Sequence, residues 1–303
     1  DYNYAVSLNT IADLLLRRLK KLFHLVLSEI AAPIYNTLYG KTKFATASIM
    51  KFEEELLQKL VNDLKNRGKT GKVIDVGCGT GRHSFHLAKQ FKEVYAFDFS
   101  PRMIEEAKRE KAREDVTNIF FSVADLEYEE IIDERAFYGK SDLVVASFGL
   151  ASFIEDTSQM LRRFYNWMQD ESYVVMSFYN SKSLILQVTP NWRDTSLSAH
   201  LDIENSTLKV ELSPESIFHI FCKPYSNVVR GAINSIFEIK DIYSYPTLMA
   251  MMPNNLLENS LAKNLFEYLD SHISNHHEFL LGYYVIVVAK KGISALDASI
   301  QIK

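Results

Sequence analysis

Between residues 73 and 178, short and continuously apolar runs alternate with stretches of helical pattern, and this alternation constrains the fold more than any other feature of the chain. Continuously apolar runs are typical of strands that are buried on both faces of a sheet. The predicted strands are Val73–Val76, Glu93–Phe97, Ile119–Val123, Leu143–Ser147 and Tyr173–Phe178. Because helices such as His83–Gln90 and Pro101–Arg113 separate them, the sequence predicts an α/β fold with a doubly wound parallel sheet.

The first 70 residues have a helical pattern instead and are predicted to form an N-terminal helical cap. Apolar residues recur at helical spacing from Leu8 to Val26, while Lys21 and His24 fall on the opposite face. Pro33 predicts that this helix ends near Ala31 or Ala32.

Two features of the first helix suggest partners. Its apolar band is broader than one helix needs, which favours packing on the domain or a homodimer through this helix. Its basic run Arg17–Lys21 leaves a membrane surface or RNA as alternatives. A second helix is predicted for Ser48–Asn66.

The regular alternation stops after the fifth strand. Residues 181–226 contain Leu208–Leu212 and Ile217–Cys222, which are predicted to form an antiparallel pair. An insert at this point lies above the carboxyl ends of the strands, where open α/β sheets bind ligands, so we predict that it forms a lid. A helix near residues 226–236 and two further strands, Phe237–Tyr243 and Tyr283–Ala289, return the chain to the core.

The turn after the first strand carries three closely spaced glycines. Gly77, Gly79 and Gly81 allow a tight turn whose backbone can lie against a ligand. The helix that follows offers free N–H groups at its N-terminus. Cys78 is interpreted as a small filler of this turn and not as a nucleophile. The spacing G-x-G-x-G differs from the G-x-G-x-x-G of nicotinamide dehydrogenases, which argues against a nicotinamide cofactor.

Acidic residues end the next two strands. Asp98 follows the second strand and can accept hydrogen bonds from both hydroxyls of a ribose. Asp125 follows the third strand and can accept from the amino group of an adenine. The alternative for each is a turn or helix cap. Together with the glycine turn, they predict a site for an adenosine-containing cofactor.

These motifs together resemble the class I S-adenosylmethionine-dependent methyltransferases. The match extends from Val73 to about Tyr179 and includes Asp98–Met103, Ala124–Leu126 and Ser141–Phe148. The resemblance implies a Rossmann-like, seven-stranded sheet whose last strand is antiparallel. It also implies S-adenosyl-L-methionine as the cofactor.

The resemblance further implies cofactor contacts at defined positions. The implied residues are Asp75, Gly77, Cys78, Gly79 and Gly81 for the methionine portion, Asp98 for the ribose, Phe99 and Met103 beside the adenine, Ala124, Asp125 and Leu126 at its edge, Ser147 and Phe148 under the sulfonium, and Tyr35 from the cap. The predicted units are the helical cap (1–70), the cofactor-binding core (71–180), the insert (181–226), the remainder of the core sheet (227–291) and a tail (292–303).

The acceptor is predicted to be a small molecule methylated on a heteroatom. Methyltransferases of base amines or glutamine amides often carry an Asp/Asn-Pro-Pro-Tyr turn after the fourth strand, whereas this chain has Ser147–Leu150 there. The predicted wall of the acceptor pocket consists of Tyr35, Tyr39, Phe44, Leu184, Ile185 and Trp192. Candidate bases or substrate contacts are Tyr35, Tyr179, His200 and His219, and no spacing singles one out.

Two other functions stay open at this point. One is a tRNA or protein methyltransferase, since Gly79–His83 also resembles wobble-uridine tRNA methyltransferases. The other is a non-catalytic, cofactor-binding partner subunit. The net charge of −4 argues against DNA, and an RNA partner is not expected.

Composition bounds the remaining possibilities. The 303 residues include no run of 18 apolar residues, so no transmembrane span is expected. Two cysteines, Cys78 and Cys222, fit a reducing, cytoplasmic setting better than a disulfide framework. A cluster of His272, His276, His277 and Glu278 is interpreted as a surface connection, so no metal is expected. The chain begins at Asp1, so a longer natural N-terminus stays open.

Overall fold

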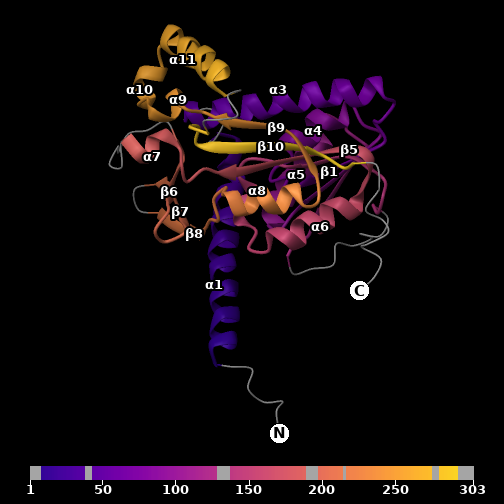
Figure 1. Ribbon diagram of the computed structural model, residues 1–303, viewed down its shortest axis with the longest axis horizontal. Coiled ribbons are helices and arrows are strands. Elements are labelled where there is room, and N and C mark those ends of the chain that lie inside the picture. The colour runs from indigo at the N-terminus through magenta and orange to yellow at the C-terminus, as the bar shows by residue number, and fades with distance from the viewer. Residues whose placement is uncertain are drawn as a thin grey trace.

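A seven-stranded sheet forms the centre of the computed structural model, which describes residues 8–37, 43–127, 137–188, 197–213, 216–274 and 280–292 (Figure 1). The strand order is β3-β2-β1-β4-β5-β10-β9. The strands are β1 Lys72–Val76, β2 Glu93–Asp98, β3 Ile119–Val123, β4 Ser141–Ala146, β5 Met168–Tyr179, β9 Glu238–Tyr245 and β10 Tyr284–Lys290. The first five strands pair in parallel, whereas β10 runs antiparallel to both β5 and β9. The predicted fold with its antiparallel last strand is therefore confirmed.

Alternate residues of each strand serve two cores, one on each face of the sheet. In β1, Val73 belongs to the core beneath α3, α4 and α5, and Ile74 to the core beneath α6 and α8. Both side chains are fully buried, which explains why the sequence of this strand is continuously apolar. These helices are α3 Phe44–Asn66, α4 Arg82–Ala88, α5 Pro101–Glu114, α6 Thr157–Trp167 and α8 Asn227–Asn234.

The strand order reverses between β1 and β4. In such a sheet, the chain builds outward from one side of the first strand and later from its other side. The connections on the two sides diverge, which opens a crevice at the carboxyl ends of the strands. The glycine turn after β1 and the Ser147–Leu150 segment after β4 therefore meet at one edge.

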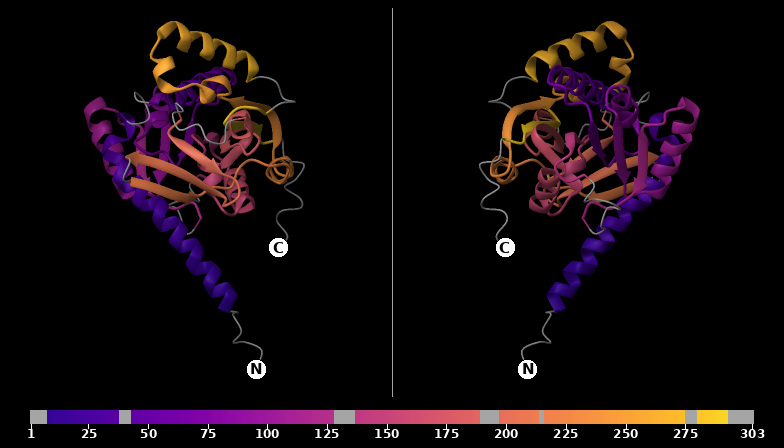
Figure 2. Two further views of the ribbon diagram at one scale, coloured as in Figure 1. Left: turned by 90° about the vertical axis from the view of Figure 1, so that its left-hand side faces the viewer. Right: turned by 90° about the vertical axis from the view of Figure 1, so that its right-hand side faces the viewer.

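The first helix is α1 Leu8–Ala31. Its carboxyl-terminal part packs across this edge, and its amino-terminal part extends beyond the body of the molecule (Figure 2). It ends where Pro33 predicts, and a 3₁₀ turn, η1 Ala32–Ile34, follows. Its orientation differs from the expected one. Leu22 and Phe23, on the apolar side, are 53% and 56% exposed, whereas Lys21 and His24 face the domain.

This reversal has a physical cause. The surface that α1 covers carries the carboxylates of Asp125 and Glu127, which pair with Lys21, and the rings of Phe99 and Phe153, which contact His24. Leu27 and Ala31, farther along the helix, are buried and add apolar contacts. Leu19, Leu22 and Val26 of the predicted apolar band are exposed and do not pack on the domain, and a homodimer through this helix stays a prediction.

The insert folds into an antiparallel sheet of three strands, β6 Ala199–Asp202, β7 Thr207–Ser213 and β8 Ser216–Phe221, in the order β6-β7-β8. A short helix, α7 Leu184–Val188, precedes it. The predicted pair corresponds to β7 and β8, and β6 is an addition that the sequence pattern did not reveal. Leu208 and Ile220 are buried, whereas Lys209 and His219 alternate with them along the same strands.

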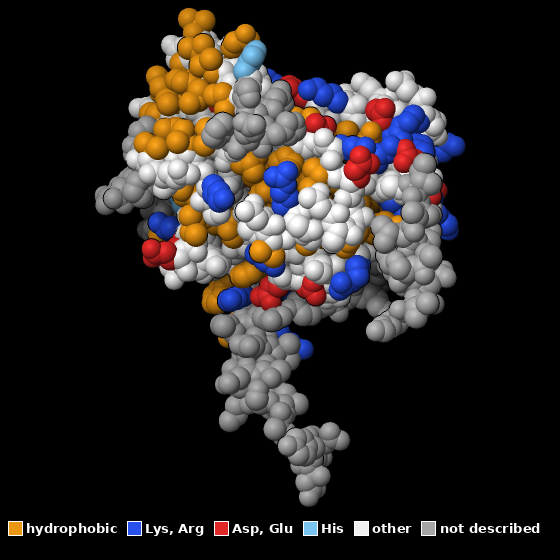
Figure 3. All heavy atoms as spheres, in the orientation of Figure 1, with side chains coloured by type: hydrophobic (Ala, Val, Ile, Leu, Met, Phe, Trp, Pro, Cys, Tyr) orange, Lys and Arg blue, Asp and Glu red, His pale blue; other side chains and the backbone are white. Residues whose placement is uncertain are grey.

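Three helices between β9 and β10 were not predicted: α9 Leu248–Met251, α10 Asn254–Leu257 and α11 Ser260–Ile273. Asp270 of α11 accepts hydrogen bonds from the backbone N–H groups of Leu248 and Met249 at 2.6 and 2.9 Å, which fixes α11 to α9. Figure 3 shows hydrophobic side chains gathered over this helical region, where Leu261 is 79% exposed.

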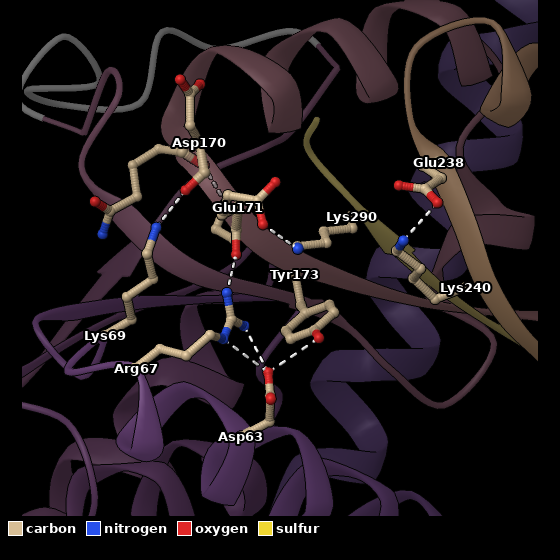
Figure 4. A network of polar contacts seen from close by, with 11 residues as sticks. Asp63, Arg67, Lys69, Asp170, Glu171, Tyr173, Glu238, Lys240 and Lys290 are labelled. Atoms are coloured by element: carbon tan, nitrogen blue, oxygen red, sulfur yellow. Dashed lines mark hydrogen bonds and ion pairs between the residues drawn. The ribbon is translucent and has the colours of Figure 1, made fainter. Parts of the chain in front are cut away.

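Polar contacts join α3 to the amino-terminal side of the sheet (Figure 4). The Arg67 guanidinium donates to the Asp63 carboxylate at 2.6 Å and to the Glu171 carbonyl at 2.7 Å. Tyr173 donates to the same Asp63 carboxylate at 3.0 Å, and Lys290 of β10 pairs with Glu171. This network lies at the beginning of β1 and β5, so it fixes α3 at the end of the sheet opposite the glycine turn.

Five groups of the earlier predictions fall on residues outside the described ranges. They are Tyr39, Trp192, His276 with His277, Glu278, and the tail from residue 293 onward.

Candidate cofactor and acceptor site

The glycine turn is held against the end of β2 by backbone contacts. Gly79 N donates to the Asp98 carboxylate at 2.9 Å, and Cys78 N donates to the Phe97 carbonyl at 3.0 Å. Gly77, Gly79 and Gly81 have φ values of 63°, 53° and 89°, a region that disfavours other residues.

The three glycines are needed for different reasons. A Cβ on Gly77 would lie 2.6 Å from the Leu150 side chain, and one on Gly81 would lie 2.8 Å from the Phe121 ring. At Gly79 the nearest atom is 3.9 Å away, on the Tyr35 ring, and the position lines a cavity. Gly77 and Gly81 therefore allow close packing, whereas Gly79 leaves space open.

Asp98 is buried at the rim of this turn. Its carboxylate accepts from Gly79 N and, through the other oxygen, from Ser100 N at 2.9 Å. Burial raises the pKa of Asp98, although these two N–H groups act in the opposite direction. Each carboxylate oxygen can accept further hydrogen bonds, so the side chain is suited to a diol.

Asp125 lies at the end of β3, as predicted, and contacts α1. The Lys21 ammonium is 2.5 Å from the Asp125 carboxylate and 3.0 Å from that of Glu127. A second attachment of α1 lies nearby, where Ser100 Oγ donates to the Glu29 carboxylate at 2.6 Å. These contacts hold the polar face of α1 over the strand ends.

His24 of α1 lies between two aromatic rings. Its ring centroid is 4.9 Å from that of Phe99 and 4.6 Å from that of Phe153. Burial, together with the charge of Lys21, lowers the pKa of His24 to about 4 despite the opposing charge of Asp125, so the imidazole is neutral at pH 7. A neutral ring is compatible with this aromatic contact.

Two adjoining cavities occupy the edge beneath α1. The larger, of about 130 Å³, lies between α1, the glycine turn, the ends of β4 and β5 and the insert, and the smaller, of about 50 Å³, lies next to Asp125. Both are lined by His24, Gly77, Asp98, Phe99, Leu150 and Phe153. Because they share these residues, we treat them as one continuous site.

Most of the predicted cofactor residues meet at these cavities. They are Tyr35, Gly77, Gly79, Asp98, Phe99, Met103, Ser147 and Phe148 at the larger cavity and Ala124, Asp125 and Leu126 at the smaller one. Asp75, Cys78 and Gly81 are not among the lining residues.

Asp75 and Cys78 support the turn from behind. The Asp75 carboxylate is 1% exposed and accepts from Ser84 Oγ of α4 at 2.6 Å, and burial raises its pKa to about 7. Burial also raises the pKa of the Cys78 thiol well above its ordinary value. A thiol held in the protonated form is a poor nucleophile, which agrees with its interpretation as a filler.

The predicted acceptor wall differs in its residues. Tyr35 lines the larger cavity, but Phe44, Leu184 and Ile185 do not, and Tyr39 and Trp192 lie outside the described ranges. The larger cavity is lined instead by residues of the insert and of α1, namely Ser198, Ala199, Leu208, Val210, Ile220, Leu27 and Ala31. Side chains alternate between the two faces of β6, β7 and β8. The strand register therefore decides which side chains of the insert point into the cavity.

The four candidate bases separate into two groups. Tyr35 and Tyr179 line the larger cavity, whereas His200 and His219 do not. Tyr179 interacts with the Tyr284 hydroxyl, which donates to it at 3.2 Å, and burial raises the pKa of Tyr179 well above its ordinary value. Tyr179 therefore stays protonated at neutral pH.

Glu53 of α3 is a polar residue of this region that sequence analysis missed. It is 1% exposed, and its carboxylate accepts from Phe148 N at 2.8 Å. The signal was available, because Glu53 lies four residues from both Ile49 and Leu57 on the buried face of a helix. A charged residue in such a place needs a specific partner.

Other kinds of site are not formed within the described ranges. In these ranges, no three His, Cys, Asp or Glu side chains gather closely enough to hold a metal ion. Of the helices described, none has both the length and the apolar character that crossing a bilayer demands.

Comparison with known proteins shows the family to which the chain belongs. Residues 67–248, more than half of its length, match a family described as a methyltransferase domain. The chain belongs to this family. The predicted resemblance to class I S-adenosylmethionine-dependent methyltransferases is thereby confirmed, and S-adenosylmethionine is the cofactor that this family implies.

Solved structures agree with this methyltransferase in fold. An S-adenosylmethionine-dependent methyltransferase of Clostridium acetobutylicum matches with a TM-score of 0.57 and 14% identity, over 86% of this chain and 98% of that one. A Pyrococcus horikoshii protein matches with a TM-score of 0.52 and 18% identity, over 85% and 98% of the two chains. At such identities, the likeness concerns the fold alone.

Curated relatives of the methyltransferase have names that point to different acceptors. Phosphoethanolamine N-methyltransferase 3 of Arabidopsis thaliana is 32% identical over 111 residues, which are 36% of this chain and 21% of that protein. An uncharacterized RNA methyltransferase of Halalkalibacterium halodurans is 32% identical over 99 residues, which are 31% of this chain and 21% of that protein. The matched segments span about a fifth of the length of these relatives.

Proposed function

We propose that this methyltransferase transfers the methyl group of S-adenosylmethionine to a heteroatom of a small, largely apolar acceptor. The observation that carries the proposal is the larger cavity, which is walled by the insert sheet on one side and by α1 on the other. Because this cavity lies next to Gly79, Ser147 and Phe148, an acceptor bound in it would lie beside the reactive end of the cofactor.

The cofactor residues are assigned by their fit to the parts of an adenosine. Asp98 would accept from the two ribose hydroxyls, and Asp125 from the adenine amino group, with Phe99 beside the ring. The open space at Gly79 would receive the methionine portion, because no side chain fills it. Bound S-adenosylmethionine supplies an activated methyl group on its sulfonium sulfur.

The residues around the cavity would align the acceptor and exclude water. Leu208, Val210 and Ile220 present apolar surface, and none of the described residues that line the larger cavity is Lys or Arg, whereas Lys21 lines the smaller one. A phosphorylated acceptor in the larger cavity would bury its negative charge without a cationic partner, which is unfavourable. This argues against phosphoethanolamine and against an RNA backbone as the bound group.

The site offers little base catalysis at neutral pH. His24 is neutral but has a pKa of about 4, so it is a weak base, and Tyr179 is protonated. The acceptor therefore brings its own lone pair, as a neutral amine or a thiolate does. The protein contributes alignment, and such proximity effects are worth about 7–11 kcal/mol.

A panel of acceptors with methyl-labelled S-adenosylmethionine tests the proposal. Aniline, which is a neutral amine at neutral pH, and thiophenol, which ionises to a thiolate, represent apolar acceptors, and phosphoethanolamine and bulk tRNA represent the alternatives. We expect label on at least one apolar acceptor and none on the other two. Label confined to tRNA or to phosphoethanolamine would contradict the proposal.

A matched variant separates the acceptor wall from the cofactor site. Val210→Thr keeps the side-chain volume and adds a hydroxyl to the apolar wall. We expect the acceptor KM to rise about tenfold, the cost of burying a hydroxyl poorly. The affinity for S-adenosylhomocysteine should stay unchanged, because Val210 lies on the insert and not on the glycine turn.

A further inference from the structure

The segment that follows β4 has an unusual backbone. Phe148 has φ 54° and Gly149 has φ 76°, so two consecutive residues occupy the left-handed region. A bulky residue such as Phe148 adopts this region only when surrounding contacts hold it there. Both Ser147 and Phe148 line the larger cavity, so the backbone of this turn helps to shape it.

Hydrogen bonds from two other elements hold this turn. Phe148 N donates to Glu53 of α3 at 2.8 Å, and Gly149 N donates to Ser177 Oγ of β5 at 2.6 Å. A side chain on Gly149 would collide with the Tyr179 ring, which lies 2.6 Å from a Cβ built there. The turn is therefore fixed by hydrogen bonds to α3 and β5 and by the close packing of the Tyr179 ring.

Glu53 also faces two basic side chains. Its second carboxylate oxygen lies 3.6 Å from His83 Nε2 and 3.7 Å from the Arg82 guanidinium. Burial alone raises the pKa of Glu53, but contact with His83, the charge of Arg82 and the N–H of Phe148 together lower it below its usual value. The pKa of His83 is also lowered, mainly by burial, so Arg82 supplies the positive charge at neutral pH.

A buried carboxylate lowers the stability of the fold unless specific contacts compensate for the loss of hydration. Desolvation opposes it, and a leucine at position 53 would continue the apolar face of α3. In the turn after β4, this charge accepts a hydrogen bond from the backbone N–H of the strained residue Phe148.

We infer that Glu53 is a positioning residue for methyl transfer: its carboxylate holds the Phe148 N–H and thereby keeps the Ser147–Gly149 turn in the geometry that aligns acceptor and methyl donor. This inference rests on the proposed function, because the turn matters for rate only if it borders the reacting groups. Arg82 and His83, which follow the glycine turn, couple Glu53 to that turn as well.

The test compares two substitutions of Glu53 with a control on the same helix. Glu53→Gln keeps a carbonyl oxygen that can accept from Phe148 N, whereas Glu53→Ala removes the acceptor. Glu55→Ala is the control, because Glu55 is an exposed acid two positions along α3. Folding of each variant is verified by circular dichroism and thermal melting.

Catalysis and binding are measured separately. The rate is the single-turnover transfer from S-adenosylmethionine to the panel acceptor that the wild-type protein methylates, and binding is calorimetric titration with S-adenosylhomocysteine. We expect Glu53→Ala to lower the rate about 100-fold, the cost of a misplacement of about 1 Å. The affinity of Glu53→Ala for S-adenosylhomocysteine should change less than fivefold. Glu53→Gln should transfer the methyl group at least tenfold faster than Glu53→Ala.

A spectroscopic measurement tests the contact without any acceptor. With ¹⁵N-phenylalanine labelling, the Phe148 amide, identified through Phe148→Tyr, should resonate downfield and exchange slowly in the wild type. Both properties should be lost in Glu53→Ala and retained in part in Glu53→Gln. If the wild type methylates no acceptor, the proposed function fails while this measurement still decides whether Glu53 fixes the turn.

Three results would overturn the inference. One is a Glu53→Ala protein that is folded and transfers methyl groups at the wild-type rate. Another is an equal loss of rate in Glu53→Ala and Glu53→Gln, which would show that charge and not the held N–H matters. The third is a Phe148 amide that is insensitive to both substitutions.

Discussion

Gly79→Ala isolates the role of the glycine turn as a ligand-binding surface. A Cβ at position 79 would be 3.9 Å from its nearest neighbour, the Tyr35 ring, so the added methyl group collides with nothing in the protein. It would instead project into the space that we assign to the cofactor. Gly77 and Gly81 are unsuitable for this test, because a Cβ at either position would collide with packed side chains.

The conformational cost of this substitution can be measured separately. Gly79 has φ 53°, and an alanine in this region costs about 1–2 kcal/mol. Gly68 provides a matched control, since it has φ 69° and no atom within 4 Å of a built Cβ, in the turn between α3 and β1. Both variants should therefore melt roughly 2–6 °C below the wild type.

The cofactor affinities of the two variants should differ. The backbone cost is the same in the free and bound protein and cancels from the binding constant. The extra methyl group at position 79 overpacks the site, which costs about 1–3 kcal/mol and weakens binding about 5- to 150-fold. Titration calorimetry with S-adenosylhomocysteine measures this, and a Gly79→Ala protein that binds as tightly as Gly68→Ala would refute the assignment of the turn.

Further predictions concern the two buried aspartates and α1. Asp98→Ala should weaken S-adenosylhomocysteine binding by about 1.5–3 kcal/mol for each lost ribose hydrogen bond; unchanged affinity in calorimetry would remove the ribose assignment. Asp75 has a pKa of about 7 in the folded protein and about 3.8 when unfolded, so its contribution to stability is highest below pH 4, falls as the pH rises from about 4 to 7, and is constant above. Asp75→Asn should remove this dependence and stabilise the protein at pH 8 by up to about 4 kcal/mol in denaturant titrations, and an unaltered pH profile would contradict the buried position of the acid. Lys21→Met should increase hydrogen exchange in α1 around residues 20–30 because the ion pairs with Asp125 and Glu127 are lost, and equal protection would show that other contacts dock the helix.

The sequence by itself determines the core and much of the cofactor edge. Continuous apolar runs identify the strands because both faces of the sheet are covered, and the glycine turn is visible because its backbone needs positive φ. Gly79, Asp98 and Asp125 can be placed together without coordinates, since the carboxyl ends of parallel strands meet at one edge. These inferences depend on local periodicity and on one topological rule.

Only the tertiary structure decides how the outer elements meet that edge. The amphipathic pattern of α1 shows which side is apolar, but not that carboxylates on the domain attract its polar side and leave Leu22 and Phe23 exposed. The apolar lining of the larger cavity by Leu208, Val210 and Ile220 depends on the register of the insert strands, because a shift of one residue would turn the opposite side chains inward.

Glu53 illustrates the same limit within a helix that the sequence did predict. Its partner Phe148 is 95 positions away in the chain, and their hydrogen bond exists only because α3 packs beside the end of β4. Helical periodicity indicates that Glu53 is buried, but periodicity carries no information about which backbone group faces it. Contacts of this kind arise from the packing of whole elements, whose relative positions are set by many weak interactions distributed over distant parts of the sequence.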